Sequence, residues 1–194
     1  FQDLAYGLAQ NGVAVLRYDK RTYTYADALA ADPESKKLTI DEETVEDARA
    51  AVALLKELDG IDNNKIFLLG HSMGGGLLSY INTGETNCAG YIILAGTPRS
   101  LWESSAAQNL LAADELESTG NLEQAEEIRA LVETETRKAA SLPGMTDEEA
   151  LDPNNSIFNV SAWYLRKFET IDPVKLHLDD GKPVLVLQGE KDRQ

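Results

Sequence analysis

The sequence predicts an α/β fold built on a mostly parallel sheet. Short, nearly continuous apolar runs recur along the chain, and helix-spaced apolar patterns separate them. Such runs are typical of strands buried on both faces, as the strands of parallel sheets are. No tight turn joins two of the runs directly, so the connections are long crossovers of the kind that parallel strands need.

The first two predicted elements are a helix and a strand. Leu4 and Leu8 share a helical face with neighbouring alanines, and the Asn-Gly pair at 11–12 is a typical helix C-terminus. The apolar run 13–16 predicts a buried strand. The polar residues 20–40 that follow predict a loop.

A second helix follows the polar segment. Thr39 and Glu42 have the spacing of a capping box, and Asp41 is an alternative N-cap. Apolar residues then recur at three- and four-residue steps up to an Asp-Gly pair at 59–60, which ends the helix. The members of this apolar face are Val45, Ala48, Ala51, Val52, Leu54, Leu55 and Leu58.

Three later apolar runs predict the other strands of the sheet. They occupy residues 65–70, 91–95 and 183–189. A glycine-rich turn after the first of them leads into the apolar helical segment 77–81.

About 80 residues without a strand pattern separate the last two runs. Residues 101–116 predict one helix, Asn121 opens a second, and Thr146 with Glu149 caps a short third. Residues 99–170 hold 14 acidic and 6 basic residues, so this insert carries −8 of the formal net charge of −15. An insert of this length has structure and a purpose of its own. The alternative is a solvated helical hairpin that only covers the sheet.

The composition excludes several classes of function. The 194 residues, 43% hydrophobic and 26% charged, suit one globular domain. A net charge of −15 disfavours nucleic acids and anionic membrane surfaces, because it cannot neutralise phosphates. No apolar run approaches the roughly 20 residues that span a bilayer. A single cysteine, Cys88, rules out an internal disulfide and a multi-cysteine metal site.

Residues 70–75, Gly-His-Ser-Met-Gly-Gly, stand between a predicted strand and a predicted helix. They fit the G-x-S-x-G pattern, in which a serine occupies a strained strand-to-helix turn and glycines replace side chains that would collide. We expect the Ser72 hydroxyl to project above the carboxyl ends of the strands as a nucleophile. The Met73 N–H then points to where an oxyanion would form. The alternative is a glycine-rich helix start with an idle serine.

Four motifs, at residues 15–21, 70–75, 93–96 and 187–192, recur together in one superfamily. With them the whole chain resembles the α/β hydrolases, and within these the bacterial serine-esterase and dienelactone-hydrolase-like branch. The resemblance implies Ser72 as nucleophile and Asp192 as the acid that orients a histidine base, in the chain order serine, acid, histidine. Glu190 is the competing acid.

The resemblance also implies three regions. These are a partial core with the nucleophile elbow at 1–98, a helical cap or lid at 99–170, and the last core strand with the acid loop at 171–194. Three aromatic side chains in or beside the insert either line an acyl or alcohol pocket or pin the insert to the sheet. They are Trp102, Trp163 and Tyr164.

Neither histidine suits the role of the base. His71 adjoins Ser72, and neighbouring side chains on a tight turn diverge. His177 is expected in a partly exposed loop at the amino end of the last strand, on the wrong side of the sheet. The resemblance places the base after Asp192, and it implies an earlier strand whose loop supplies a second oxyanion N–H. We therefore expect a sequence truncated at both ends and a sheet with a gap.

The resemblance implies a Ser-His-Asp carboxylesterase that cleaves small or medium acyl esters. A peptidase, thioesterase or lactone hydrolase of the same fold is the first alternative, and a non-catalytic fragment or binding module is the second. No metal or cofactor motif appears, so we expect neither group. An incomplete sheet favours homo-oligomers or strand exchange. The single cysteine fits the cytoplasm, although a removed signal peptide is equally compatible with the sequence.

Overall fold

A parallel sheet forms the centre of the fold. The computed structural model describes residues 1–84 and 86–192, and within them three strands pair in the order β1-β2-β3. The strands are β1 (Phe67–His71), β2 (Gly90–Leu94) and β3 (Val184–Leu187). Both pairings are parallel, as predicted. The α/β class with an incomplete parallel sheet is therefore confirmed.

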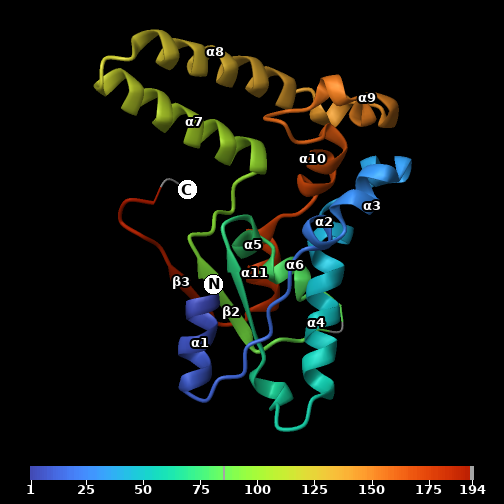
Figure 1. Cartoon of the computed structure of the whole chain (residues 1–194). Coiled ribbons are helices and arrows are strands. Elements are labelled where there is room, and N and C mark those ends of the chain that lie inside the picture. Colours follow the sequence, from blue (N-terminus) through green and yellow to red (C-terminus); the bar gives the residue numbers. More distant parts are fainter. Residues whose placement is uncertain (85, 193–194) are drawn as a thin grey trace.

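Helical segments make both connections between the strands and surround the sheet (Figure 1). The α-helices are α1 (Gln2–Gln10), α2 (Arg21–Thr24), α3 (Ala26–Ala31), α4 (Glu46–Glu57), α5 (Met73–Gly76), α6 (Leu78–Ile81), α7 (Leu101–Ser118), α8 (Leu122–Ala139), α9 (Asp147–Leu151), α10 (Ala162–Phe168) and α11 (Pro173–Asp180). A π-helical turn, η2 (Asp41–Val45), precedes α4. Short 3₁₀ turns are η1 (Pro33–Lys37), η3 (Asn63–Lys65), η4 (Leu142–Gly144) and η5 (Pro153–Asn155).

The first predicted strand is absent. Residues 13–20 are extended but pair with no strand, and the side chains of Val13 and Val15 are 48% and 41% exposed. The reason is the lack of a neighbour, because an apolar run becomes a strand only when another strand completes its hydrogen bonds. In the described part of the chain, β1 pairs on one edge alone, with β2.

The predicted loop at 20–40 is also wrong, since α2, α3 and η1 lie within it. A contact distant in sequence holds this region. The Arg21 guanidinium donates to the Asp47 carboxylate at 2.6 Å and reaches Glu46 at 3.2 Å, which ties α2 to α4. These ion pairs raise the pKa of Arg21 further above its usual range.

Both predicted capping pairs form hydrogen bonds, but the N-cap of η2 is Ile40 and not Thr39 or Asp41. Glu42 accepts from the Thr39 N–H at 2.8 Å, and the Thr39 hydroxyl accepts from the Asp41 N–H at 3.2 Å. Thr146 and Glu149 form a reciprocal capping box at α9. Both pairs satisfy N–H groups that have no acceptor inside the helix.

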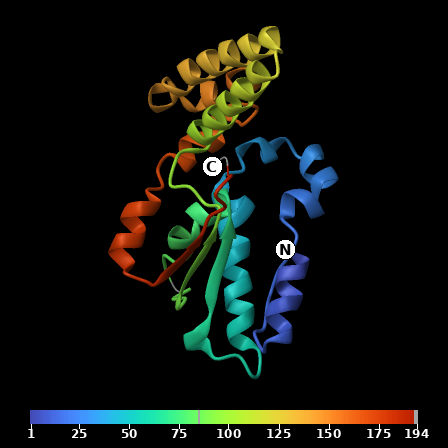
Figure 2. The same cartoon turned by 90° about the vertical axis from the view of Figure 1, so that its left-hand side faces the viewer.

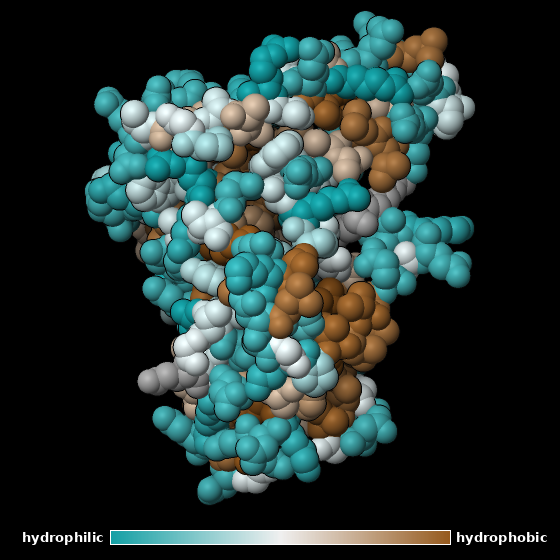
Figure 3. Space-filling model, turned by 180° about the vertical axis from the view of Figure 1, so that it is seen from behind, coloured by the Kyte–Doolittle hydropathy of each residue, from teal (hydrophilic) through white to brown (hydrophobic). Residues whose placement is uncertain are grey.

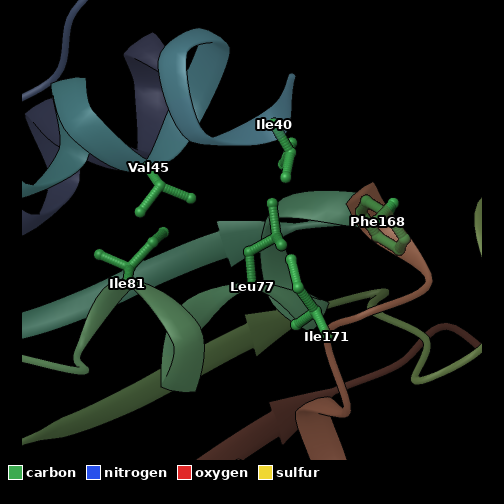
Figure 4. Close-up of a cluster of buried hydrophobic side chains, with 6 residues drawn as sticks. All are labelled: Ile40, Val45, Leu77, Ile81, Phe168 and Ile171. Carbon is green, nitrogen blue, oxygen red and sulfur yellow. The ribbon is translucent and has the colours of Figure 1, made fainter. Parts of the chain in front are cut away.

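A buried cluster on one face of the sheet joins the start of α4, α6 and the segment from α10 to α11 (Figure 4). We call it the central cluster. Its buried members are Ile40, Val45, Leu77, Ile81, Phe168 and Ile171, and Met73 and Tyr164 pack against it. It therefore lies directly beneath the turn that follows β1.

The opposite face is thinly covered. Helices α1 and α11 lie on opposite sides of the sheet (Figure 2), but α1 has no buried residue. The four residues of β3 are 40–53% exposed. Figure 3 shows an apolar area on the side of the molecule where Figure 1 draws β3 and α1.

The long insert forms a helical hairpin of α7 and α8, which lies beyond the end of the sheet where α5 begins (Figure 1). Buried Ala113, Ala125 and Val132 pack between the two helices. Arg129 also bridges them, at 2.7 Å from Asp114 and 2.5 Å from Glu117. The three-region division of the chain stays a prediction.

The central cluster should dominate stability. Leu77→Ala removes a side chain with 0% exposure, and we expect it to lower the free energy of unfolding by about 3 kcal/mol, since it leaves a cavity. Leu178→Ala is the matched control, because Leu178 is 74% exposed and should cost well under about 1 kcal/mol. Urea denaturation followed by circular dichroism measures both. Equal losses would contradict the assignment of the core.

Candidate active site

Ser72 occupies a strained turn between β1 and α5. Its φ is 55° and its ψ is −125°, a backbone conformation that residues other than glycine rarely adopt. Its N–H donates to the Leu94 carbonyl at 3.0 Å, and its carbonyl accepts from the Gly75 N–H at 2.9 Å. The turn is therefore fixed to the end of β2 on one side and to α5 on the other.

Gly70 makes this turn sterically possible. A Cβ at Gly70 would lie 2.2 Å from the Gly74 carbonyl oxygen and 2.4 Å from its carbon. The collision predicted for a side chain at Gly74 is wrong, because a Cβ there would meet nothing within 4 Å outside its own helix. The close contact is made by the Gly74 backbone, whereas a side chain on Gly74 would make no such contact.

Two further glycines allow α5 to pack closely on β2. A Cβ at Gly75 would lie 3.0 Å from Ile93 Cγ2 and 3.2 Å from Gly96 Cα, and a Cβ at Gly96 would lie 2.5 Å from Ile93 Cγ2. Sequence reasoning did not assign a role to Gly96. Its position directly after a predicted strand was the available signal.

Met73 is the first residue of α5, so its N–H has no acceptor within the helix. Its side chain packs against the central cluster, and its Sδ lies 4.0 Å from the Tyr164 hydroxyl. The residue predicted as the oxyanion donor is thus held by its side chain as well as by the helix.

Asp192 lies beyond the same edge of the sheet as Ser72. Ser72 follows β1 and Asp192 follows β3, and both strands run parallel to β2, so their carboxyl ends coincide. Strands β1 and β3 flank β2 and are therefore about 10 Å apart. The Asp192 N–H donates to the Gly189 carbonyl at 3.1 Å, which closes a turn. Glu190 lies in the same turn, and both acids are exposed.

The two histidines lie in different places. The His71 ring contacts Phe1 edge-on, with ring centres 5.5 Å apart. His177 lies in α11 and not in the predicted loop, and its ring centre is 5.6 Å from that of Tyr91. Tyr91 pairs with Leu68, four residues and about 13 Å before Ser72 along β1. His177 is accordingly far from the nucleophile.

Two of the three aromatic candidates line a common cavity. Trp102 and Trp163 face a space of about 800 Å³, with Leu142, Arg166 and Glu169 also in its wall. Burial raises the pKa of Glu169, whose carboxylate accepts from the Ser100 hydroxyl at 2.9 Å. Among the described residues, Ser72 and Tyr164 are not part of this wall.

Tyr164 makes its main polar contact with Glu43, outside this cavity. Its hydroxyl donates to the Glu43 carboxylate at 2.5 Å. Burial, and then this hydrogen bond, raise the pKa of Tyr164 well above its usual range. Sequence reasoning missed Glu43, because the Asp-Glu-Glu run at 41–43 has the ordinary composition of a helix N-terminus.

Among residues 1–84 and 86–192, no group of three or more histidine, cysteine, aspartate or glutamate side chains has an arrangement suited to a metal ion.

Two comparisons with known proteins found matches. A family model described as serine aminopeptidase, S33, matches residues 1–194. The esterase EstD of Thermotoga maritima is 30% identical over 194 residues, which are 100% of this chain and 41% of that protein. The chain thus spans about two fifths of the length of this curated relative. No solved structure matches.

The two elbow glycines should differ sharply in their tolerance of a side chain. Gly70→Ala places a methyl group against the Gly74 backbone, and we expect a loss of about 3 kcal/mol or more. Gly74→Ala meets open space and improves helix propensity, so the free energy of unfolding should stay within about 1 kcal/mol. Urea denaturation decides. A stable Gly70→Ala protein would mean that the turn is built differently.

Proposed function

The chain belongs to the serine aminopeptidase S33 family of α/β hydrolases, and from this premise we propose that its protein is a serine carboxylesterase acting on small or medium acyl esters. The observation that supports it most is the strained Ser72, held in place by the contact between Gly70 and Gly74. The esterase name of the relative that is 30% identical supports an ester substrate. We also propose that, within the α/β hydrolases, the chain falls in the bacterial serine-esterase and dienelactone-hydrolase-like branch.

In the proposed mechanism, the Ser72 Oγ attacks the ester carbonyl carbon while a histidine takes its proton. The carbonyl oxygen becomes an oxyanion that accepts from the Met73 N–H. The alcohol leaves with the proton from the histidine, and water then releases the acid by the same steps. Asp192 orients the histidine. Because His177 lies about 13 Å or more along the sheet, we assign the base to a histidine outside this chain.

We propose that residues 99–170 form a lid and that Trp102 and Trp163 receive the acyl or alcohol part of the substrate. Their shared cavity of about 800 Å³ supports a pocket, since apolar walls with a few polar groups are typical of ligand sites. Ser72 does not line this cavity, so the proposal requires a substrate that extends from the cavity to the elbow. The acidic insert disfavours strongly anionic substrates, although salt screens this effect.

Other functions have support of their own. The family description names an aminopeptidase, so an amide substrate is the second candidate. A thioesterase or a lactone hydrolase needs the same elbow. A non-catalytic module is the candidate of a different class, and the distance between His177 and the elbow favours it.

We propose a cytoplasmic location, which the buried, unpaired thiol of Cys88 suits. No helix in the described ranges combines the length and the apolar character required to cross a bilayer. The exposed β3 supports self-association or strand exchange as a further proposal.

The full-length protein should react with a fluorophosphonate probe at Ser72. Asp192→Asn should lower kcat on a p-nitrophenyl ester by about 10⁴-fold, because the base loses its orienting charge. Glu190→Gln is the matched control in the same turn and should change kcat by less than about threefold. Labelling at another residue, or the reverse order of the two variants, would refute the assignment.

The 194-residue chain by itself should hydrolyse p-nitrophenyl esters at or near the background rate, because His177 lies about 13 Å or more from the elbow and the His71 ring contacts Phe1. Purified chain and its Ser72→Ala variant are compared at equal concentration. Turnover that survives purification and vanishes in Ser72→Ala would show that a base within this chain serves the serine.

A further inference from the structure

Helix α10 is held by the segment 37–43 through three polar contacts, which we call the α10 clasp. The Trp163 Nε1 donates to the Lys37 carbonyl at 2.8 Å. The Tyr164 hydroxyl donates to Glu43 at 2.5 Å, and the Lys167 ammonium lies 2.7 Å from Asp41. The acidic partners, Asp41 and Glu43, both belong to the π-helical turn η2, and both reach α10.

The Glu43 carboxylate is fixed from both sides. Its Oε2 accepts from Tyr164, while its Oε1 accepts from the Thr22 hydroxyl at 3.3 Å and lies 3.5 Å from the Lys20 ammonium. The Glu43 side chain is only 19% exposed. A half-buried carboxylate with several partners resists movement more than a fully exposed charge does, since each lost contact leaves a partly desolvated group without a partner.

Tyr164 connects this carboxylate to the elbow. Its ring packs against the central cluster together with Met73, and its hydroxyl lies 4.0 Å from the Met73 Sδ. A tyrosine hydroxyl is protonated at neutral pH, and burial raises the pKa of Tyr164 further, so the hydroxyl is a donor to Glu43. Methionine has three rotatable bonds and needs such a neighbour to hold one conformation.

We propose that Glu43 is a positioning residue for acyl transfer at Ser72, acting through Tyr164 on Met73 and thereby on the N–H that receives the oxyanion. The inference rests on the proposed function, since it assigns Glu43 to that reaction. Displacing an oxyanion donor by about 1 Å can cost about 10²-fold in rate, so a modest shift of Met73 is sufficient.

The first test is spectroscopic and needs no catalysis. The chain contains two methionines, so [¹³C-methyl]methionine labelling gives two signals, and Met145, which packs in a different buried cluster, is an internal reference. Glu43→Ala should shift the Met73 signal and leave the Met145 signal unmoved. Glu43→Gln keeps an acceptor for Tyr164 and should restore the Met73 position. Asp41→Ala removes the Lys167 contact and the acceptor of the Tyr80 hydroxyl but keeps Glu43 and Tyr164, and it should leave the Met73 signal in place.

The second test is kinetic and uses the full-length enzyme. Glu43→Ala and Tyr164→Phe should each lower kcat on a p-nitrophenyl ester about tenfold with little change in KM. The double variant should lose no more than either single variant, because both remove one contact. Glu43→Gln should regain most of kcat, and Asp41→Ala should keep it.

Three results would overturn the inference. These are an unmoved Met73 signal in Glu43→Ala, an unchanged kcat in that variant, or an equal loss in Asp41→Ala, which would mean that the clasp only holds α10. A full-length wild-type protein without Ser72-dependent turnover would instead refute the proposed function, and the methionine signals would still decide whether Glu43 positions Met73.

Discussion

The close approach of the backbone at Gly70 and Gly74 is the constraint on which the site depends. A Cβ at Gly70 would lie 2.2 Å from the Gly74 carbonyl oxygen, so this turn requires a glycine two residues before the serine. The approach forces Ser72 to a φ of 55° and directs it beyond the carboxyl edge of the sheet. The hydrogen bond from Ser72 to Leu94 then fixes the strained residue to β2. A protein retains such strain where the surrounding structure determines it fully.

The sequence predicts those features of the site and fold that depend on residues close together in the chain. Residues 70–75 encode the turn in neighbouring glycines, and the helix caps at Thr39 and Thr146 depend on residues three positions away. Residues 13–16 have the composition of a strand, but strand formation needs a partner that no local pattern reports. The Tyr164 contact with Glu43 spans 121 residues, so only the folded chain brings the two together.

The buried face and the thinly covered face of the sheet have different consequences. Met73 and Tyr164 pack against the central cluster, so the same contacts stabilise the core and hold the site residues in place. The other face leaves β3 exposed along its whole length, and an uncovered apolar strand is a surface for association. The packing around Met73 therefore depends on the central cluster, whereas β3 has little cover among the described residues.

The π-helical turn η2 limits how this protein can change in length. Such a turn holds one residue more than an α-helical turn between the same two ends. Deleting a single residue from Asp41–Val45 would close the turn to regular α-helix between the same two ends and change the direction of the side chains within the turn. Glu43 would then no longer face Tyr164. A relative that lacks one residue within this segment would therefore have lost the contact.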